Sequence, residues 1–146
     1  MSTSKDIFPV FDKLLQRKQK EERLKQHACV VWMIGLSGSG KTTIAVALEK
    51  LLFEKGYFIQ VLDGDNVRSG LNNNLGFTEE DRMENIRRIA EAAKLFVEAG
   101  VITICCFVSP TEQIRSTAKS IIGNNDFVEV YVKTSIEECE KRDVKG

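Results

Sequence analysis

Eight residues near the start of the chain have the types and the spacing needed to hold a chain of phosphates. The stretch from Gly35 to Thr42 follows the pattern Gly-x-x-x-x-Gly-Lys-Thr. Glycines allow backbone conformations that other residues avoid, so several N–H groups can point at one anion. A lysine at this place reaches the β- and γ-phosphates, and the threonine hydroxyl binds Mg²⁺. The predicted nucleotide-binding residues are Gly35, Leu36, Ser37, Gly38, Ser39, Gly40, Lys41, Thr42 and Thr43.

The residues on either side of this loop provide the context that the motif requires. Residues 29–34 form an unbroken apolar run, as expected for a parallel strand that is buried on both faces. After the loop, apolar residues recur at helical spacing as far as Lys55, and Gly56 ends the expected helix. A glycine-rich surface loop is the alternative, but it does not explain a strand, a loop and a helix in register.

Two carboxylates follow the second expected strand, residues 57–62. Asp63 and Asp65, together with Arg68, come just past its carboxyl end. A surface turn can also carry the sequence Asp-Gly-Asp. However, open α/β sheets bind ligands at the carboxyl ends of their strands, where the phosphate loop also lies. We therefore predict that these side chains belong to the same site as the loop.

The next stretch carries further polar and aromatic candidates. Phe77 is aromatic in a polar setting, so it is either a stacking platform for a base or a buried anchor. Arg82 and Asn85 are three residues apart near the start of the following helix and so share a face. Such a pair by itself is most often solvated surface. Ser109 follows the third strand, again on the ligand edge.

Strands and helices alternate along the rest of the chain. Further strands are predicted over residues 101–108, without charge and hence central, and over 127–132. Helices are predicted between Thr78, with a capping box, and Gly100, and over 111–122 and 136–141. The alternation implies a parallel sheet with right-handed crossovers and a three-layer α/β/α fold.

The composition is that of an ordinary globular domain. Lysine plus arginine and aspartate plus glutamate both total 21, so the formal charge is zero, which argues against nucleic-acid binding driven by bulk charge. The 4 cysteines form no Cys-x-x-Cys pair, and Cys105 and Cys106 are expected on opposite faces of a strand. No apolar run approaches the ~20 residues of a membrane span. We expect a cytoplasmic protein without membrane or nucleic-acid partners.

The first 26 residues differ from the rest. An apolar patch at residues 7–11 is expected to pack on the main body or on a second subunit. The charged segment that follows, residues 13–25, has only a weak apolar stripe. It is expected to be a solvated helix or arm, and binding of a charged partner is the alternative. We therefore divide the chain into an N-terminal arm, 1–26, and a phosphate-loop domain, 27–146.

With these residues in view, the chain resembles the adenylylsulfate kinases, a family of phosphate-loop kinases. The resemblance extends from about residue 16 to the end of the chain. The phosphate loop alone occurs in many kinases, but the full set of motifs in this order is specific. The motifs occupy residues 32–42, 62–68, 71–77, 82, 84–88, 107–110 and 142–146.

The resemblance implies the fold of the phosphate-loop nucleoside triphosphate hydrolases, with ATP and Mg²⁺ as cofactors. It also implies transfer of the γ-phosphoryl of MgATP to the 3′-hydroxyl of adenosine 5′-phosphosulfate, and commonly a homodimer. The implied catalytic residues are Asp63, Lys41 and Ser109. The implied metal-binding residues are Thr42 and Asp63. The implied substrate-binding residues are Asp65, Arg68, Phe77, Arg82, Asn85, Val108, Ser109 and Lys145.

The resemblance also suggests a phosphoserine intermediate at the position of Ser109. Direct in-line transfer, however, needs only positioning and charge stabilisation.

The sequence departs from the family pattern at several places. Glu112 falls in a stretch where the family has an arginine, and the change bears on substrate affinity or on inhibition. Val144 replaces a common proline, and Thr42 a common serine.

Beyond Gly146 the family continues with a lid and an adenine-binding segment. As written, the chain is therefore expected to bind phosphates but to hold adenine weakly. Two alternatives to an adenylylsulfate kinase remain: another small-molecule kinase on the same fold, and a nucleotide-binding module that does not turn over ATP. Acceptor choice tests the first alternative, and ATP-dependent turnover tests the second.

Overall fold

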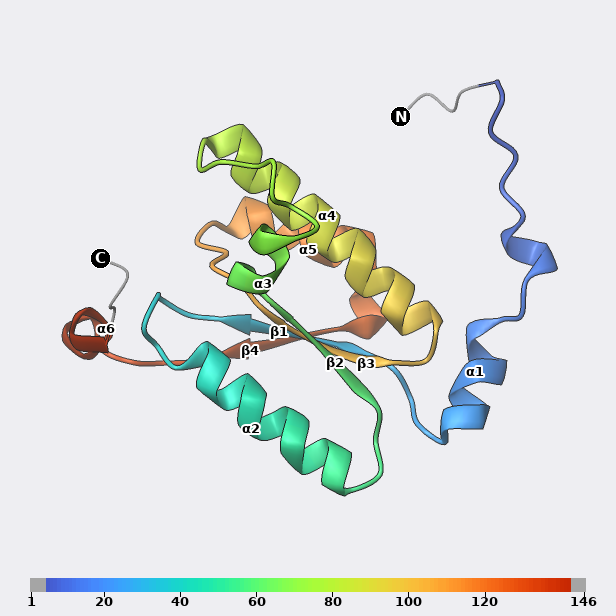
Figure 1. Cartoon of the computed structure of the whole chain (residues 1–146), viewed down its shortest axis with the longest axis horizontal. Helices are drawn as coiled ribbons and strands as arrows, with labels where there is room; N and C mark the ends of the chain where they lie inside the picture. The colour runs from blue at the N-terminus through green and yellow to red at the C-terminus, as the bar shows by residue number, and fades with distance from the viewer. Residues whose placement is uncertain (1–4, 143–146) are drawn as a thin grey trace.

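A computed structural model describes residues 5–142 of the chain (Figure 1). Four strands form one sheet: β1 (Val30–Ile34), β2 (Ile59–Asp63), β3 (Ile102–Cys106) and β4 (Phe127–Tyr131). The α-helices are α1 (Arg17–Leu24), α2 (Lys41–Glu54), α3 (Gly64–Ser69), α4 (Glu79–Glu98), α5 (Glu112–Ile122) and α6 (Ile136–Arg142). Two short 3-10 helices cover Phe11–Lys13 and Asn124–Asp126. Within the described residues, no helix is long and apolar enough to cross a lipid bilayer.

The sheet is parallel, with the strand order β2-β3-β1-β4. β3 lies inside the sheet and all five of its residues are buried, which confirms the prediction of a central strand. Successive side chains of a strand point to opposite faces. Accordingly, Cys105 belongs to the apolar cluster on one face and Cys106 to the cluster on the other, as predicted.

Helices cover both faces, which makes the three-layer fold predicted from the alternation of elements (Figure 1). On one face, Trp32 packs with the apolar stripe of α4 and with α5 in a core that includes Ile86, Ile89 and Ile114. On the other face, α2 packs Ala45, Leu48 and Leu52 against the sheet. The strands leave these layers at a common edge, where β1 runs into the phosphate loop and β2 into α3.

The start of α4 differs from the predicted capping box. Thr78 caps the helix, because its hydroxyl accepts a hydrogen bond from the Asp81 N–H at 3.1 Å. In a capping box the side chain at Asp81 would return to the N–H of Thr78. Its Oδ2 instead accepts from the Gly76 N–H at 2.9 Å. Asp81 therefore fixes the preceding loop against the helix.

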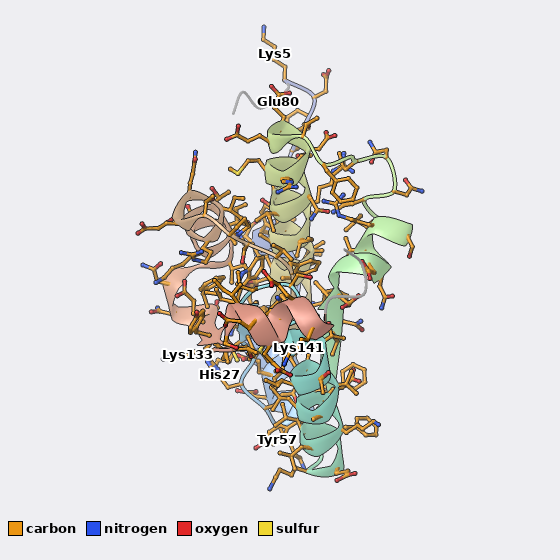
Figure 2. The ribbon with its side chains drawn as sticks, turned by 90° about the vertical axis from the view of Figure 1, so that its left-hand side faces the viewer. Lys5, His27, Tyr57, Glu80, Lys133 and Lys141 are labelled. Carbon is orange, nitrogen blue, oxygen red and sulfur yellow. The ribbon has the colours of Figure 1, made fainter. Side chains whose placement is uncertain are left out.

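The N-terminal part of the chain has two sections. In the first, residues 5–15, the apolar side chains are exposed, with Phe8 79% and Phe11 80% accessible. The second contains α1 and is bound to the body: Arg17 donates to Asp126 at 2.7 Å, and Gln26 donates to the carbonyl of Gly100 at 2.7 Å. In Figure 2 the arm extends toward the end of the molecule that carries Glu80, away from Tyr57.

Candidate functional site

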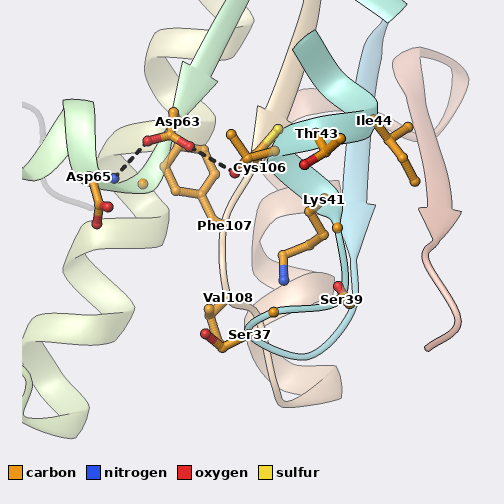
Figure 3. A pocket seen from close by; sticks show the side chains of 14 residues that line it. Ser37, Ser39, Lys41, Thr43, Ile44, Asp63, Asp65, Cys106, Phe107 and Val108 are labelled. Carbon is orange, nitrogen blue, oxygen red and sulfur yellow. Dashed lines mark hydrogen bonds between the residues drawn. The ribbon is translucent and has the colours of Figure 1, made fainter. Parts of the chain in front are cut away.

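The phosphate loop curves around the ammonium group of Lys41 (Figure 3). Lys41 is the first residue of α2, and its Nζ donates to the carbonyls of Gly35 at 2.7 Å and Leu36 at 2.8 Å. The lysine is buried, and the loss of solvent lowers its pKa. The loop therefore holds a cation that is only partly neutralised by carbonyl dipoles, which is a favourable place for phosphate oxygens.

A pocket of about 800 Å³ opens over the loop. Its lining includes residues 37–44 of the loop and α2, residues 63–65 at the end of β2 and the start of α3, and residues 106–108 at the end of β3 and just beyond it. The loop also contains an orphaned polar atom. Ser39 Oγ is buried and has no hydrogen-bond partner among the described residues. A glycine-rich loop with a central ammonium and a free hydroxyl fits the phosphates of a nucleotide.

Asp63 is brought to the loop from the end of β2. Its Oδ1 accepts a hydrogen bond from Thr42 Oγ1 at 3.2 Å. Its Oδ2 accepts from the N–H groups of Asp65 at 3.1 Å and Asn66 at 3.4 Å, which caps α3 (Figure 3). A hydroxyl and a carboxylate are hard oxygen ligands, so this pair fits Mg²⁺.

The short helix α3 was not predicted. The sequence after Leu62 has the composition of a turn, and the helix forms because Asp63 satisfies two of its free N–H groups. α3 places Asp65 in the pocket lining and Arg68 beside the loop that follows, where it donates to the carbonyl of Gly76.

Another part of the pocket wall lies at the end of β3 and in the residues that follow it. Cys106 and Val108 line the pocket, whereas Ser109 does not. Burial, with a smaller contribution from the Asp63 carboxylate, raises the pKa of Cys106 to about 11. The thiol is therefore protonated at neutral pH and is no nucleophile. Ser109 is buried, and its Oγ accepts a hydrogen bond from Trp32 Nε1 at 3.2 Å.

Phe77, Arg68 and Arg82 form a second cluster beside the pocket. The Arg68 guanidinium lies over the Phe77 ring, 4.4 Å from its centroid, and donates to the carbonyl of Gly76 at 2.9 Å. Arg82 Nε donates to the carbonyl of Phe77 at 3.0 Å. Phe77 is 70% exposed, so its interpretation as a buried anchor is wrong.

Asn85 does not lie on a solvated face, which was the ordinary expectation for its pairing with Arg82. Its side chain is buried against Asn72, whose Nδ2 donates to Asn85 Oδ1 at 2.8 Å. Sequence reasoning missed Asn72, because it is one of three consecutive asparagines and nothing marks it out. The prediction for Lys145 lies outside the described residues.

The segment after β4 rests on the phosphate loop. Thr134 Oγ1 donates to the carbonyl of Ser39 at 2.8 Å. Gly38 has φ of +80°, and a Cβ added there would lie 2.5 Å from the carbonyl oxygen of Cys139 in α6. At Gly35 a Cβ would lie 2.7 Å from Ser39 Oγ and 2.8 Å from the carbonyl oxygen of Val132. The loop thus has no room for side chains at these two glycines.

Comparison with known proteins agrees with this geometry. The sequence model of adenylylsulphate kinase matches residues 27–146. The chain belongs to the adenylylsulphate kinase family. This result confirms the resemblance seen in the motifs, the predicted fold and the expectation of an ATP-dependent kinase. It does not favour either alternative, another small-molecule kinase or a nucleotide-binding module without turnover.

Two curated adenylylsulphate kinases show how much of the chain the similarity covers. The adenylyl-sulfate kinase of Bacteroides thetaiotaomicron is 58% identical over 146 residues, which is 100% of this chain and 73% of that protein. The adenylyl-sulfate kinase of Phocaeicola vulgatus is 60% identical over 141 residues, 97% of this chain and 69% of that protein.

Solved structures of adenylylsulphate kinases have the same fold. The kinase of Mycobacterium tuberculosis, determined in complex with AMPPNP and APS, matches with a TM-score of 0.78 and 43% identity. This match covers 82% of this chain and 70% of the solved one. A hexameric kinase from Thiobacillus denitrificans matches with a TM-score of 0.65 and 36% identity, over 74% of this chain and 23% of that one.

The contact between Gly38 and α6 yields a prediction about nucleotide binding. Gly38→Ala should raise the KM for ATP about 10-fold or more, because strain of this kind costs about 1–3 kcal/mol and the loop must deform to relieve it. Steady-state kinetics with varied ATP measure the change.

The matched control is Gly56→Ala. Gly56 also has positive φ, at +96°, but nothing lies within 4 Å of an added Cβ. This variant should lose some thermal stability and keep the KM for ATP. An equal rise in KM for both variants would show that the packing of α6 on the loop does not matter to the nucleotide.

Proposed function

We propose that this chain transfers the γ-phosphoryl group of MgATP to the 3′-hydroxyl of adenosine 5′-phosphosulfate, giving ADP and 3′-phosphoadenosine 5′-phosphosulfate. The observation that carries the proposal is the contact between Thr42 and Asp63, 3.2 Å apart. It sets a carboxylate from the end of β2, which β3 separates from β1 in the sheet, beside the phosphate loop, where an acceptor hydroxyl has to lie for in-line transfer.

The donor side of the site is the loop from Gly35 to Thr43. In our proposal its N–H groups hold the phosphates, and the Lys41 ammonium leaves the carbonyls of Gly35 and Leu36 to bind the β- and γ-phosphates. Thr42 and Asp63 would hold Mg²⁺, which when bound neutralises the charge that develops on the phosphate oxygens. The buried setting of Lys41 strengthens its attraction for anions.

The acceptor side is assigned to the residues after β2 and at the start of α4. Asp63 holds the acceptor hydroxyl as the base, and Asp65 lies beside it. Arg68, Arg82 and Asn85 bind the phosphosulfate and ribose, since the guanidinium fork suits tetrahedral anions. The exposed Phe77 ring stacks on the substrate base, with Arg68 already on one of its faces.

Val108 lines the acceptor pocket, and we propose a positioning role for Ser109. The hydrogen bond from Trp32 Nε1 and the burial of Ser109 support a residue that shapes the pocket wall over one that carries a phosphoryl group. Direct transfer to the acceptor needs no such carrier.

We also propose the division into an arm, 1–26, and a kinase domain, 27–146, the homodimer and the cytoplasmic setting. The exposed apolar side chains of residues 7–15 support the dimer, because such side chains are usually covered. The four cysteines are unpaired, in keeping with a reducing compartment.

The activity is tested with MgATP and adenosine 5′-phosphosulfate, by following ADP and the 3′-phosphorylated product. Adenosine 5′-monophosphate serves as the control acceptor, and Lys41→Ala as the matched inactive chain. We expect product from the phosphosulfate only, and none from the variant. Turnover with the monophosphate at a similar rate would point to a different kinase, and ADP formation by Lys41→Ala would place the donor site elsewhere.

The role of Asp63 is tested by Asp63→Asn, which the structure makes a clean substitution. Asparagine caps a helix about as well as aspartate, so α3 should persist while the negative charge is lost. If Asp63 is the base, kcat should fall by roughly 10²–10⁴. Circular dichroism checks the helix content. A loss of only a few-fold with normal folding would reduce Asp63 to a positioning group.

The dimer is tested by light scattering after size-exclusion chromatography. The chain should elute with twice the mass of 16.4 kDa, and the pair Phe8→Glu and Phe11→Glu should convert it to a monomer. The control is Phe53→Glu, which changes another exposed aromatic residue, 65% accessible on α2. A monomeric wild type, or a dimer that survives the paired change, would contradict the proposal.

A further inference from the structure

The loop between α3 and α4 contains a fully buried polar side chain that no step of the reaction uses. Asn72 has no accessible surface. Its own N–H donates to the carbonyl of Val67 at 2.9 Å, which ties the loop to α3. A buried amide costs free energy unless all its groups are bonded, so its partners reveal what it holds in place.

The partners of Asn72 determine how its amide is oriented. Its Nδ2 donates to Asn85 Oδ1 at 2.8 Å and to the Asn85 carbonyl at 3.3 Å. Its Oδ1 faces Arg88, whose Nη1 lies at 3.5 Å and also donates to Asn74 Oδ1 at 2.8 Å. If the Asn72 amide were flipped, its oxygen would face the two oxygens of Asn85, and its nitrogen would face the Arg88 guanidinium. Only one orientation is therefore favourable.

The same bond fixes the amide of Asn85. Its Oδ1 is occupied by Asn72, so the Nδ2 group is the part that remains for a ligand. Within residues 5–142, the structure gives Nδ2 no acceptor. Asn85 is one turn along α4 from Arg82, which contacts the Phe77 carbonyl. The face of α4 toward the acceptor cluster thus presents N–H donors and a guanidinium, a set that suits oxygen atoms of an anion.

We propose that Asn72 is a positioning residue that holds Asn85 with its N–H₂ group toward the acceptor substrate, and so favours an acceptor with an anionic group at that place. This inference rests on the proposed function of Asn85 as a phosphosulfate ligand. Asn72 does not touch the substrate. It acts by making Asn85 a donor and by preventing the flipped state, in which Asn85 would present an oxygen to the anion.

The test is Asn72→Asp, which keeps the shape and the acceptor for Arg88 but turns the donor into an oxygen. Asn85 must then flip to donate to the carboxylate that the substitution introduces, and its Oδ1 would face the substrate. We expect the KM for adenosine 5′-phosphosulfate to rise about 10- to 100-fold, as for the loss of a hydrogen bond to a charged group. The KM for ATP should stay within about 2-fold, since the phosphate loop is untouched.

The control is Asn73→Asp. It makes the same change of charge one residue along the same loop, where the side chain is exposed. Its KM for the phosphosulfate should stay near that of the wild type. An equal rise in both variants would mean that the added negative charge, and not the orientation of Asn85, weakens binding, and it would overturn the inference.

A double-mutant cycle with Asn85→Ala decides whether Asn72 acts through Asn85. If it does, Asn85→Ala raises the KM for the phosphosulfate, and adding Asn72→Asp changes it by less than about 2-fold. The inference would be overturned if the two substitutions raised the KM additively, or if Asn85→Ala raised it and Asn72→Asp did not. Either result would leave the proposed function standing. An Asn85→Ala enzyme with an unchanged KM would instead refute the proposed role of Asn85.

Asn72 is buried, so its variants must also be checked for folding. Thermal unfolding and the KM for ATP report on the fold and on the donor site. If Asn72→Asp does not fold, Asn72→Ser replaces it in the cycle, because serine adds no charge and is too short to hold both oxygens of Asn85. The same selective rise in KM, absent in the Asn85→Ala background, is expected. An unchanged KM in folded Asn72→Ser would overturn the inference.

Discussion

The nucleotide site depends on the interaction between the ammonium group of Lys41 and the carbonyls of its own loop. A buried cation is costly unless it has partners, and the carbonyls of Gly35 and Leu36 supply them at 2.7 and 2.8 Å. These bonds keep the loop curved around a central charge. The carbonyls are also weaker partners for the ammonium than phosphate oxygens, because a dipole neutralises a cation less fully than an anion does. The loop is thus held ready for a nucleotide.

The rest of the donor site follows from this curvature. A tight loop leaves no space for side chains at Gly35 and Gly38, and the segment after β4 fills the space behind it. Thr134 and the α6 backbone at Cys139 contact the loop directly. The phosphate loop is therefore supported by a part of the chain that is distant in sequence, because α6 and the residues before it pack directly on the loop.

The acceptor side is built in a different way. It has no single central charge, and its arginines are bonded to loop carbonyls or lie over Phe77. A chain of polar contacts then runs from Glu84, 3.6 Å from Arg88, through Arg88 to Asn72 and Asn85. The polar network therefore joins the loop after α3 to α4, the two elements that carry most of the proposed acceptor ligands.

The predictions made from sequence were most accurate where one local pattern decides the structure. The uncharged run of β3 identified an inner strand, and glycines ended α2 and α4 close to the predicted places. They were less accurate where a side chain had to choose between partners. Asp81 bonds the loop at Gly76 rather than completing a capping box, and Asp63 turns a predicted turn into α3.

The sequence by itself determined the phosphate loop, the alternation of strands and helices and the family, because these depend on residue types at fixed spacing. Only the tertiary structure decided which polar residues meet. It put Asp63 beside Thr42, buried Ser109 under Trp32, and chose Asn72 from three adjacent asparagines as the partner of Asn85. Such pairings join segments that lie 13 to 77 residues apart, and no local pattern encodes them, because they form only when the folded chain brings those segments together.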